Sequence, residues 1–196
     1  MLAIRTRSPE ETRILGASLA PMLLPGDVIS LTGDLGAGKT VLVQGLAAAL
    51  GVEQRVTSPT FMIVHEYEGR YPILHLDVYR LNSFQEVIDL GFEEYLDPNA
   101  ILLIEWGEAV GPLLPRRYLE IDIRQALEAE AMLDRVVSFN PHGPEWIRKL
   151  EGMRNTAEAL LDAASPEVES EPRFWDHRDP SSREDRQTDE GLAGEG

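Results

Sequence analysis

The chain has 196 residues, 43% hydrophobic and 27% charged, a composition typical of a globular protein built around one main domain. Its net charge of −16 disfavours unaided binding to nucleic acid or to an anionic membrane surface. It has no cysteine, which excludes disulfide frameworks and thiolate metal sites.

The first half of the chain predicts a helix, a strand and a second helix, in that order. The stretch "SPEE" at 8–11 matches a capping box that opens a helix, and one of the next two prolines must end it. The apolar, β-branched run "DVISLTG" at 27–33 predicts a strand. After a glycine-rich loop, "TVLVQGLAAAL" at 40–50 predicts a helix that stops at Gly51.

Two further strands are expected to pair as a hairpin. They are "TFMIVHEY" at 60–67 and "YPILHLDVY" at 71–79, separated by the short turn "EGR". The next segment, "SFQEVIDLGFEEYL" at 83–96, begins with a second capping box, Ser83 with Glu86. It predicts one helix or a pair of short helices.

The rest of the body supplies three more strands. The almost wholly apolar run "AILLIEW" at 100–106 predicts a strand in the middle of a sheet that is covered on both faces. The alternating runs "YLEIDI" at 118–123 and "DRVVSF" at 134–139 predict a final antiparallel pair. Helices alternating with strands in this way indicate an α/β domain with a mixed sheet.

The sequence divides into a body at 1–143, a helix at 144–164 and a tail at 165–196. Apolar residues at helical intervals predict the helix. The tail holds 10 acidic and 4 basic residues with little aliphatic content, so we expect it to be disordered. Because neither a signal-peptide core nor an apolar run of about 18 residues is apparent, a soluble cytoplasmic protein is the expectation.

The glycine-rich loop carries the first chemical signal. Gly33, Gly38, Lys39 and Thr40 fill the pattern G-x-x-x-x-G-K-[ST], in which backbone N–H groups and a helix N-terminus cradle phosphate. The lysine would reach the β- and γ-phosphates, and the threonine hydroxyl would bind Mg²⁺. Because a strand precedes the loop and a helix follows it, we expect a nucleoside triphosphate site in a three-layer fold like that of P-loop NTPases, with parallel and antiparallel strands in the sheet.

Two acids that end strand-like runs are candidates for the catalytic and metal-binding carboxylates. Asp77 ends "LHLD" and Glu105 ends "LLIE". Since the carboxyl ends of strands in open α/β sheets converge on the ligand crevice, either acid could hold Mg²⁺ or orient the attacking water. A lone strand-end acid is usually an ordinary surface carboxylate, but the P-loop favours a functional role for both, with their division of labour open.

Other polar and aromatic residues near these motifs allow two readings. The segment "VTSPTF" at 56–61 could sense the γ-phosphate or could be a simple turn. Trp106 could pack on nucleotide or belong to the core. His65 and His75 lack metal-ligand spacing and are more simply structural. Arg80 could stabilise phosphate charge or pair with an acid such as Glu105.

Taken together, these motifs resemble the TsaE (YjeE) family of bacterial P-loop ATPases. The resemblance rests on "TGDLGAGKT", "VTSPTF", "HLDVYRL", "LGFEEYL" and "LLIEWGE" in this order, and it runs from about Ser8 to Phe139. It implies an ATPase needed for the threonylcarbamoyladenosine modification of tRNA. It also implies TsaB and TsaD as protein partners, with tRNA contacted only indirectly and no membrane.

The resemblance also implies roles for individual residues. Lys39, Asp77 and Glu105 would serve catalysis, and Thr40, Glu105 and Asp77 would be the Mg²⁺ positions. Segments 57–60 and 77–80 resemble the two switch regions. The residues expected at the nucleotide are Thr12, Gly33, Asp34, Leu35, Gly36, Ala37, Gly38, Lys39, Thr40, Thr60, Trp106 and Arg135. ATP and Mg²⁺ are the expected substrate and cofactor.

A small P-loop nucleotide or small-molecule kinase is the alternative function. It should show an arginine-rich lid, and Arg116 with Arg117 is the one adjacent arginine pair, placed before a strand. A GTP-dependent switch would need the base-reading motif N-K-x-D, which the sequence does not contain. A degenerate, non-hydrolysing module is disfavoured because every expected phosphate and metal position is filled.

Overall fold

The structure is a computed structural model that describes residues 2–59, 64–81, 84–89, 91–126, 134–164 and 174–176. Its strands are β1 (Leu2–Thr6), β2 (Val28–Thr32), β3 (Val64–Glu68), β4 (Pro72–Asp77), β5 (Ile101–Glu105), β6 (Tyr118–Gln125), β7 (Arg135–His142) and β8 (Phe174–Asp176). Its helices are α1 (Pro9–Leu19), α2 (Lys39–Ala49), α3 (Phe84–Asp89) and α4 (Pro144–Ala164), with 3₁₀ helices η1 (Ala20–Met22), η2 (Phe92–Tyr95) and η3 (Gly107–Leu113).

The strands form one mixed sheet in the order β3-β4-β5-β2-β6-β7-β1-β8. The four strands β4, β5, β2 and β6 run parallel. The outer strands join through antiparallel pairs, with β3 beside β4 on one side and β7, β1 and β8 in turn beyond β6 on the other. Because the four central strands are parallel, their carboxyl ends share one edge of the sheet, and loops that carry function can meet there.

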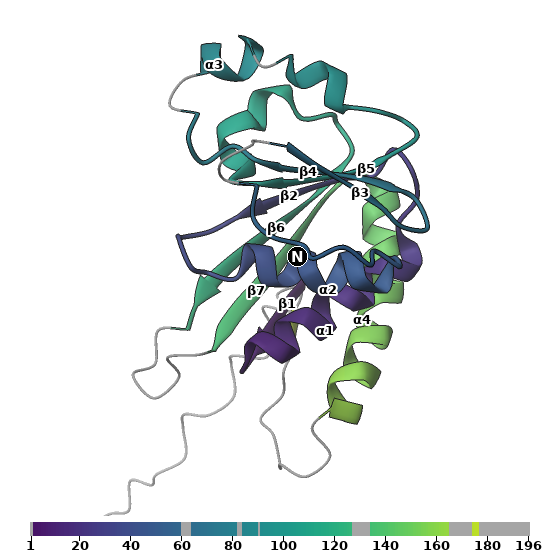
Figure 1. Ribbon diagram of the computed structural model, residues 1–196. Coiled ribbons are helices and arrows are strands. Elements are labelled where there is room, and N and C mark those ends of the chain that lie inside the picture. The colour runs from purple at the N-terminus through teal and green to yellow at the C-terminus, as the bar shows by residue number, and fades with distance from the viewer. Residues whose placement is uncertain are drawn as a thin grey trace, which may run out of the picture.

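Helices cover both faces of the sheet and make three layers (Figure 1). Alternate residues of the central strands point to opposite faces: Ile29 of β2 belongs to the core under α1, α2 and α4, whereas Val28 belongs to a smaller core with η2 and η3. β5 is buried at all five positions, as expected for a strand with helices on both sides. The expected three-layer α/β fold with a mixed sheet is therefore confirmed.

Most of the predicted elements are present. Ser8 caps α1 by accepting a 3.1 Å hydrogen bond from the backbone N–H of Glu11, whose carboxylate accepts from Arg7 N. α2 ends close to Gly51, which adopts the expected positive φ of 85°. β3 and β4 form the predicted hairpin, and β6 and β7 the predicted antiparallel pair. The segment at 83–96 contains two short helices, α3 and η2; Ser83 lies outside the described residues.

α4 covers the same residues as the predicted helix and is part of the main core. Trp146, Leu150, Met153, Ala157 and Leu161 are buried on one stripe of it. In the predicted tail, Phe174–Asp176 form the edge strand β8 beside β1, and the other tail residues lie outside the described part of the chain.

The sequence analysis missed β1. The residues of its partner β7 lie 129 to 137 positions further along the sequence, from Thr6 opposite Arg135 to Leu2 opposite Phe139. Such pairing leaves little local signal in a five-residue run. No helix in the described part of the chain combines the length and apolarity needed to cross a bilayer.

Close packing of α1 against α2 depends on two glycines, Gly16 in α1 and Gly45 in α2, and this gives a stability test. A Cβ at Gly45 would lie 1.9 Å from the carbonyl oxygen of Arg13, so Gly45→Ala should lower the free energy of unfolding by about 2 kcal/mol. The matched control is Gly152→Ala in α4, where a Cβ meets nothing within 4 Å; it should raise stability by roughly 0.5–1 kcal/mol. Urea unfolding measures both, and equal effects would contradict the close approach of the two helices.

Candidate functional site at the P-loop

The loop between β2 and α2 is shaped by three glycines. Gly33, Gly36 and Gly38 have φ values of 123°, 77° and 111°, in the left-handed region where glycine is favoured. At Gly33 a Cβ would also lie 2.1 Å from the carbonyl oxygen of Ile123 in β6. The loop can therefore wrap closely around an anion, and α2 begins immediately after it with its partly positive N-terminus turned to that space.

Lys39 is held at the base of this loop. Its Nζ donates hydrogen bonds to the carbonyl oxygens of Gly33 (2.7 Å) and Asp34 (3.0 Å). The same nitrogen lies 3.6 Å from the ring centroid of Trp106. Burial lowers the pKa of Lys39 from its usual range, and nearby carboxylates, led by Glu105, oppose that shift. Since an ammonium has three donors and the two carbonyls account for two of them, its position suits a ligand oxygen as a third partner.

Glu105 joins the P-loop helix to the sheet. It ends β5, is 3% exposed, and accepts one hydrogen bond from the Thr40 hydroxyl, shared between its two carboxylate oxygens at 2.8 Å and 3.0 Å. His75 Nε2 lies 3.0 Å from Oε1 of the same carboxylate. The side chain is thus fixed between the first turn of α2 and strand β4.

Asp77 lies beside Glu105 and is tied to the segment expected to be a switch. Asp77 and Glu105 are directly opposite in the parallel pair of β4 and β5. The Asp77 carboxylate accepts from Ser58 Oγ at 2.5 Å and from the backbone N–H of Tyr79 at 3.0 Å. Asp77 therefore connects segment 57–59 with the residues after β4. A movement of one of these segments can be transmitted to the other through the Asp77 carboxylate.

Trp106 covers the cavity from the end of β5. It has a φ of 63°, and a left-handed conformation costs an L-residue roughly 1–2 kcal/mol. Tyr79 packs on its ring with centroids 4.7 Å apart. The next residue, Gly107, lies so close to Ser30 that a Cβ there would come within 2.0 Å of Ser30 Oγ. This contact fixes the turn that presents the indole to Lys39.

These groups line one cavity of about 360 Å³. It is bounded by Leu35, Gly36, Gly38, Lys39, Thr40, Val41, Ser58, Asp77, Tyr79, Glu105 and Trp106. Carboxylate and hydroxyl oxygens are ligands that Mg²⁺ accepts, commonly one or two from the protein together with phosphate oxygens. The donor set of Thr40, Glu105 and Asp77 fits that ion. Within the described ranges no cluster of three or more His, Cys, Asp or Glu is placed to hold a metal by itself.

The remaining expected nucleotide residues lie in different places. Arg135 in β7 is next to the loop, because its Nε donates to the carbonyl oxygen of Ala37 at 3.0 Å. Thr12 is buried in α1, and its hydroxyl bonds to the Thr6 hydroxyl (2.8 Å) and to the Ser8 carbonyl (3.1 Å) rather than to the loop. Thr60 lies outside the described residues.

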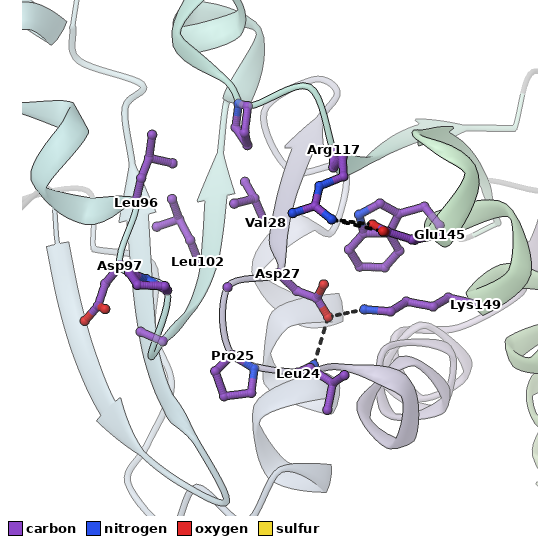
Figure 2. Close-up of a pocket in the computed structure, with 15 residues that line it drawn as sticks. Leu24, Pro25, Asp27, Val28, Leu96, Asp97, Leu102, Arg117, Glu145 and Lys149 are labelled. Carbon is purple, nitrogen blue, oxygen red and sulfur yellow. Dashed lines mark hydrogen bonds and ion pairs between the residues drawn. The ribbon is translucent and has the colours of Figure 1, made fainter.

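A second cavity, of about 530 Å³, opens at the opposite end of the sheet, where β2 and β5 begin (Figure 2). Figure 2 shows that both of its basic side chains pair with acids of the same cavity: Lys149 with Asp27, and Arg117 with Glu145. The P-loop cavity instead gathers a helix N-terminus, an ammonium group and two carboxylates. We therefore take the P-loop cavity as the functional site.

Sequence reasoning missed two contacts of this site. His75 was interpreted as structural, yet it bonds to Glu105, and Tyr79 supports Trp106. The spacing contained a usable signal: His75 and Asp77 are two residues apart on one strand, so both point to the face where Glu105 lies. The spacing alone could not identify Glu105 as their neighbour, because this requires the register between β4 and β5.

The fold is like that of P-loop NTPases, with a glycine loop joining a central parallel strand to a helix that begins with Lys and Thr. Comparison with known proteins narrows this class. The family model for the threonylcarbamoyl adenosine biosynthesis protein TsaE matches residues 6–133, and the chain belongs to the TsaE family.

Individual proteins that are similar in sequence or structure support the assignment to this family. The tRNA threonylcarbamoyladenosine biosynthesis protein TsaE of Bacillus subtilis (strain 168) is 43% identical over 143 residues, which is 72% of this chain and 87% of that protein. The protein of the same name from Treponema pallidum (strain Nichols) is 40% identical over 119 residues, 61% of this chain and 88% of that protein. The crystal structure of Bacillus subtilis YdiB superimposes with a TM-score of 0.68 at 34% identity, covering 79% of this chain and 95% of that one.

The position of Trp106 gives a direct binding test. A phosphate that approaches Lys39 would change the contact between its ammonium and the indole ring, so adding ATP with Mg²⁺ should change the emission of Trp106. The chain has three tryptophans, and the variant Trp106→Phe, which keeps the other two, should lose the change. An unchanged spectrum in the unmodified protein at saturating ATP would contradict this placement of the phosphates.

Proposed function

We propose that this protein binds ATP with Mg²⁺ in the P-loop cavity and hydrolyses it in support of threonylcarbamoyladenosine synthesis on tRNA, in the cytoplasm. The observation that carries the proposal is the contact between the Thr40 hydroxyl and Glu105 beside the ammonium of Lys39. Family membership supports the pathway, because the TsaE relatives carry threonylcarbamoyladenosine biosynthesis in their names.

Binding of the triphosphate is supported by the charge and shape of the loop. Three left-handed glycines allow the backbone N–H groups to face the phosphates, and the N-terminus of α2 adds a favourable dipole. Lys39, already fixed by two carbonyl oxygens, contacts the phosphates as a preset positive charge. Burial lowers the pKa of Lys39, and the negative charge of a bound phosphate would counteract that shift.

Hydrolysis requires a positioned water molecule and stabilisation of the phosphoryl charge. A bound Mg²⁺ would supply charge neutralisation, with Thr40, Glu105 and Asp77 as the residues that hold it. Asp77 or Glu105 orients the attacking water, and both face the same cavity. Because the Asp77 carboxylate bonds to Ser58, the state of the nucleotide can be transmitted to segment 57–59.

Partner proteins account for the link to tRNA. At a net charge of −16 the chain is poorly suited to hold tRNA directly, so we propose that TsaB and TsaD contact the substrate and that this protein acts on them. Slow turnover alone and faster turnover in the complex are expected, because a partner can order the site or supply a catalytic arginine.

The kinase alternative gains no support from the position of its arginine pair. Arg117 lines the second cavity, at the end of the sheet opposite the P-loop, and pairs with Glu145 there. A lid that closes over the γ-phosphate needs arginines near the P-loop.

Phosphate release from ATP tests the proposal. Turnover should rise when TsaB and TsaD are added, and Lys39→Ala should reduce it by about 10²-fold or more, because the phosphates lose their fixed positive charge. Circular dichroism of the variant checks that it is folded. Absence of turnover in every mixture, with ATP consumed when a small acceptor is supplied, would overturn the ATPase and favour the kinase.

A further inference from the structure

His75 is a buried polar residue that the proposed reaction does not use directly. It lies in β4, is 0% exposed, and its Nε2 is 3.0 Å from Oε1 of Glu105. Its second ring nitrogen, Nδ1, is buried and has no hydrogen-bond partner within the described residues. The ring packs beside Tyr67, with centroids 6.2 Å apart, and faces the main core.

This arrangement has a free-energy cost that an apolar side chain would avoid. A buried polar atom without a hydrogen bond is unfavourable, and a leucine at this position could pack against the same neighbours without that cost. The contact with Glu105 offsets that cost, because a carboxylate accepts a stronger hydrogen bond than a neutral acceptor does. Because a carboxylate can only accept, a hydrogen bond between these two atoms requires a proton on Nε2.

Glu105 needs a second hydrogen-bond donor, because the Thr40 hydroxyl that donates to it would also bind Mg²⁺. The Thr40 hydroxyl has a single proton, shared between the two carboxylate oxygens at 2.8 Å and 3.0 Å. In the proposed function, the lone pairs of the same hydroxyl bind Mg²⁺, which ties Thr40 to the nucleotide. His75 holds Glu105 from the strand side, in a part of the core where it cannot move with the ligand.

We propose that His75 is the positioning residue for Glu105: its Nε2–H fixes the carboxylate in the orientation that Mg²⁺ with nucleotide requires. This inference rests on the proposed function and specifies one of its parts. Partners of metal-binding groups commonly change metal affinity by about 10–100-fold when they are removed. His75 therefore acts on the Mg²⁺ dependence of the protein and leaves the phosphate cradle unchanged.

The test is equilibrium binding of a fluorescent ATP analogue, titrated with Mg²⁺, to the full chain and two variants. His75→Leu removes the donor at similar volume, and the Mg²⁺ concentration that gives half of the Mg²⁺-dependent change should rise about 10-fold or more. Binding of the analogue without Mg²⁺ should stay within about twofold, because Lys39 and the glycine loop are untouched. His75→Gln keeps an N–H donor at the place of Nε2 and should restore the midpoint to within about threefold.

Two results would overturn the positioning role. An unchanged midpoint in folded His75→Leu shows that Glu105 needs no second anchor, and equal losses in the Leu and Gln variants show that packing rather than the hydrogen bond matters. Failure of the proposed function looks different: the unmodified protein itself would not bind the analogue at any Mg²⁺ concentration, and the inference would fail with it.

A measurement on the unmodified protein covers the case in which the variants do not fold. Nitrogen NMR of the histidine side chains should find Nε2 of His75 protonated. A ring with its proton on Nδ1 alone has no donor for Glu105, and that result would overturn the proposal.

Discussion

The hydrogen bond between Thr40 and Glu105 is the contact on which the site depends. It joins the first turn of α2 to the end of β5 and thereby sets the P-loop against the central strands. The sheet makes this contact possible, since β4, β5, β2 and β6 run parallel and end at one edge. The close approach of Gly33 to β6 brings the loop to the same edge, where a larger residue could not fit. The parallel packing of the central strands therefore also determines where the chemical groups of the site meet.

Charges in the P-loop cavity have partners within the protein. Lys39 uses two loop carbonyls and the face of Trp106, and Asp77 uses Ser58 and the backbone of Tyr79. Such preorganisation limits the reorganisation needed when phosphate arrives. In the proposed function, the same contacts would connect a bound nucleotide with the surface: Tyr79 packs on Trp106 and is half exposed. A partner that binds this side chain would act on the residue that covers Lys39, which agrees with an ATPase controlled by other proteins.

Local sequence signals predicted the elements whose shape depends on neighbours in the chain. The capping box at Ser8, the glycine loop and the apolar run that forms β5 each specify their structure within about ten residues. β1 was missed because its partner β7 is remote in sequence. The role of His75 was missed for a related reason: its contact with Glu105 depends on how β4 and β5 are aligned, which a single sequence does not specify. Asp77 and Glu105 lie side by side at the cavity, at the strand ends from which the sequence predicted them.

A crystal structure of the protein with Mg²⁺ and a non-hydrolysable ATP analogue tests the central claim most directly. The account predicts phosphate oxygens within hydrogen-bonding distance of Lys39 Nζ and a metal ion bound by the Thr40 hydroxyl on the side of Glu105. The carboxylate should keep its contact with His75. A nucleotide in the cavity of Figure 2, or one in the P-loop with its metal ion remote from both Thr40 and Glu105, would contradict it.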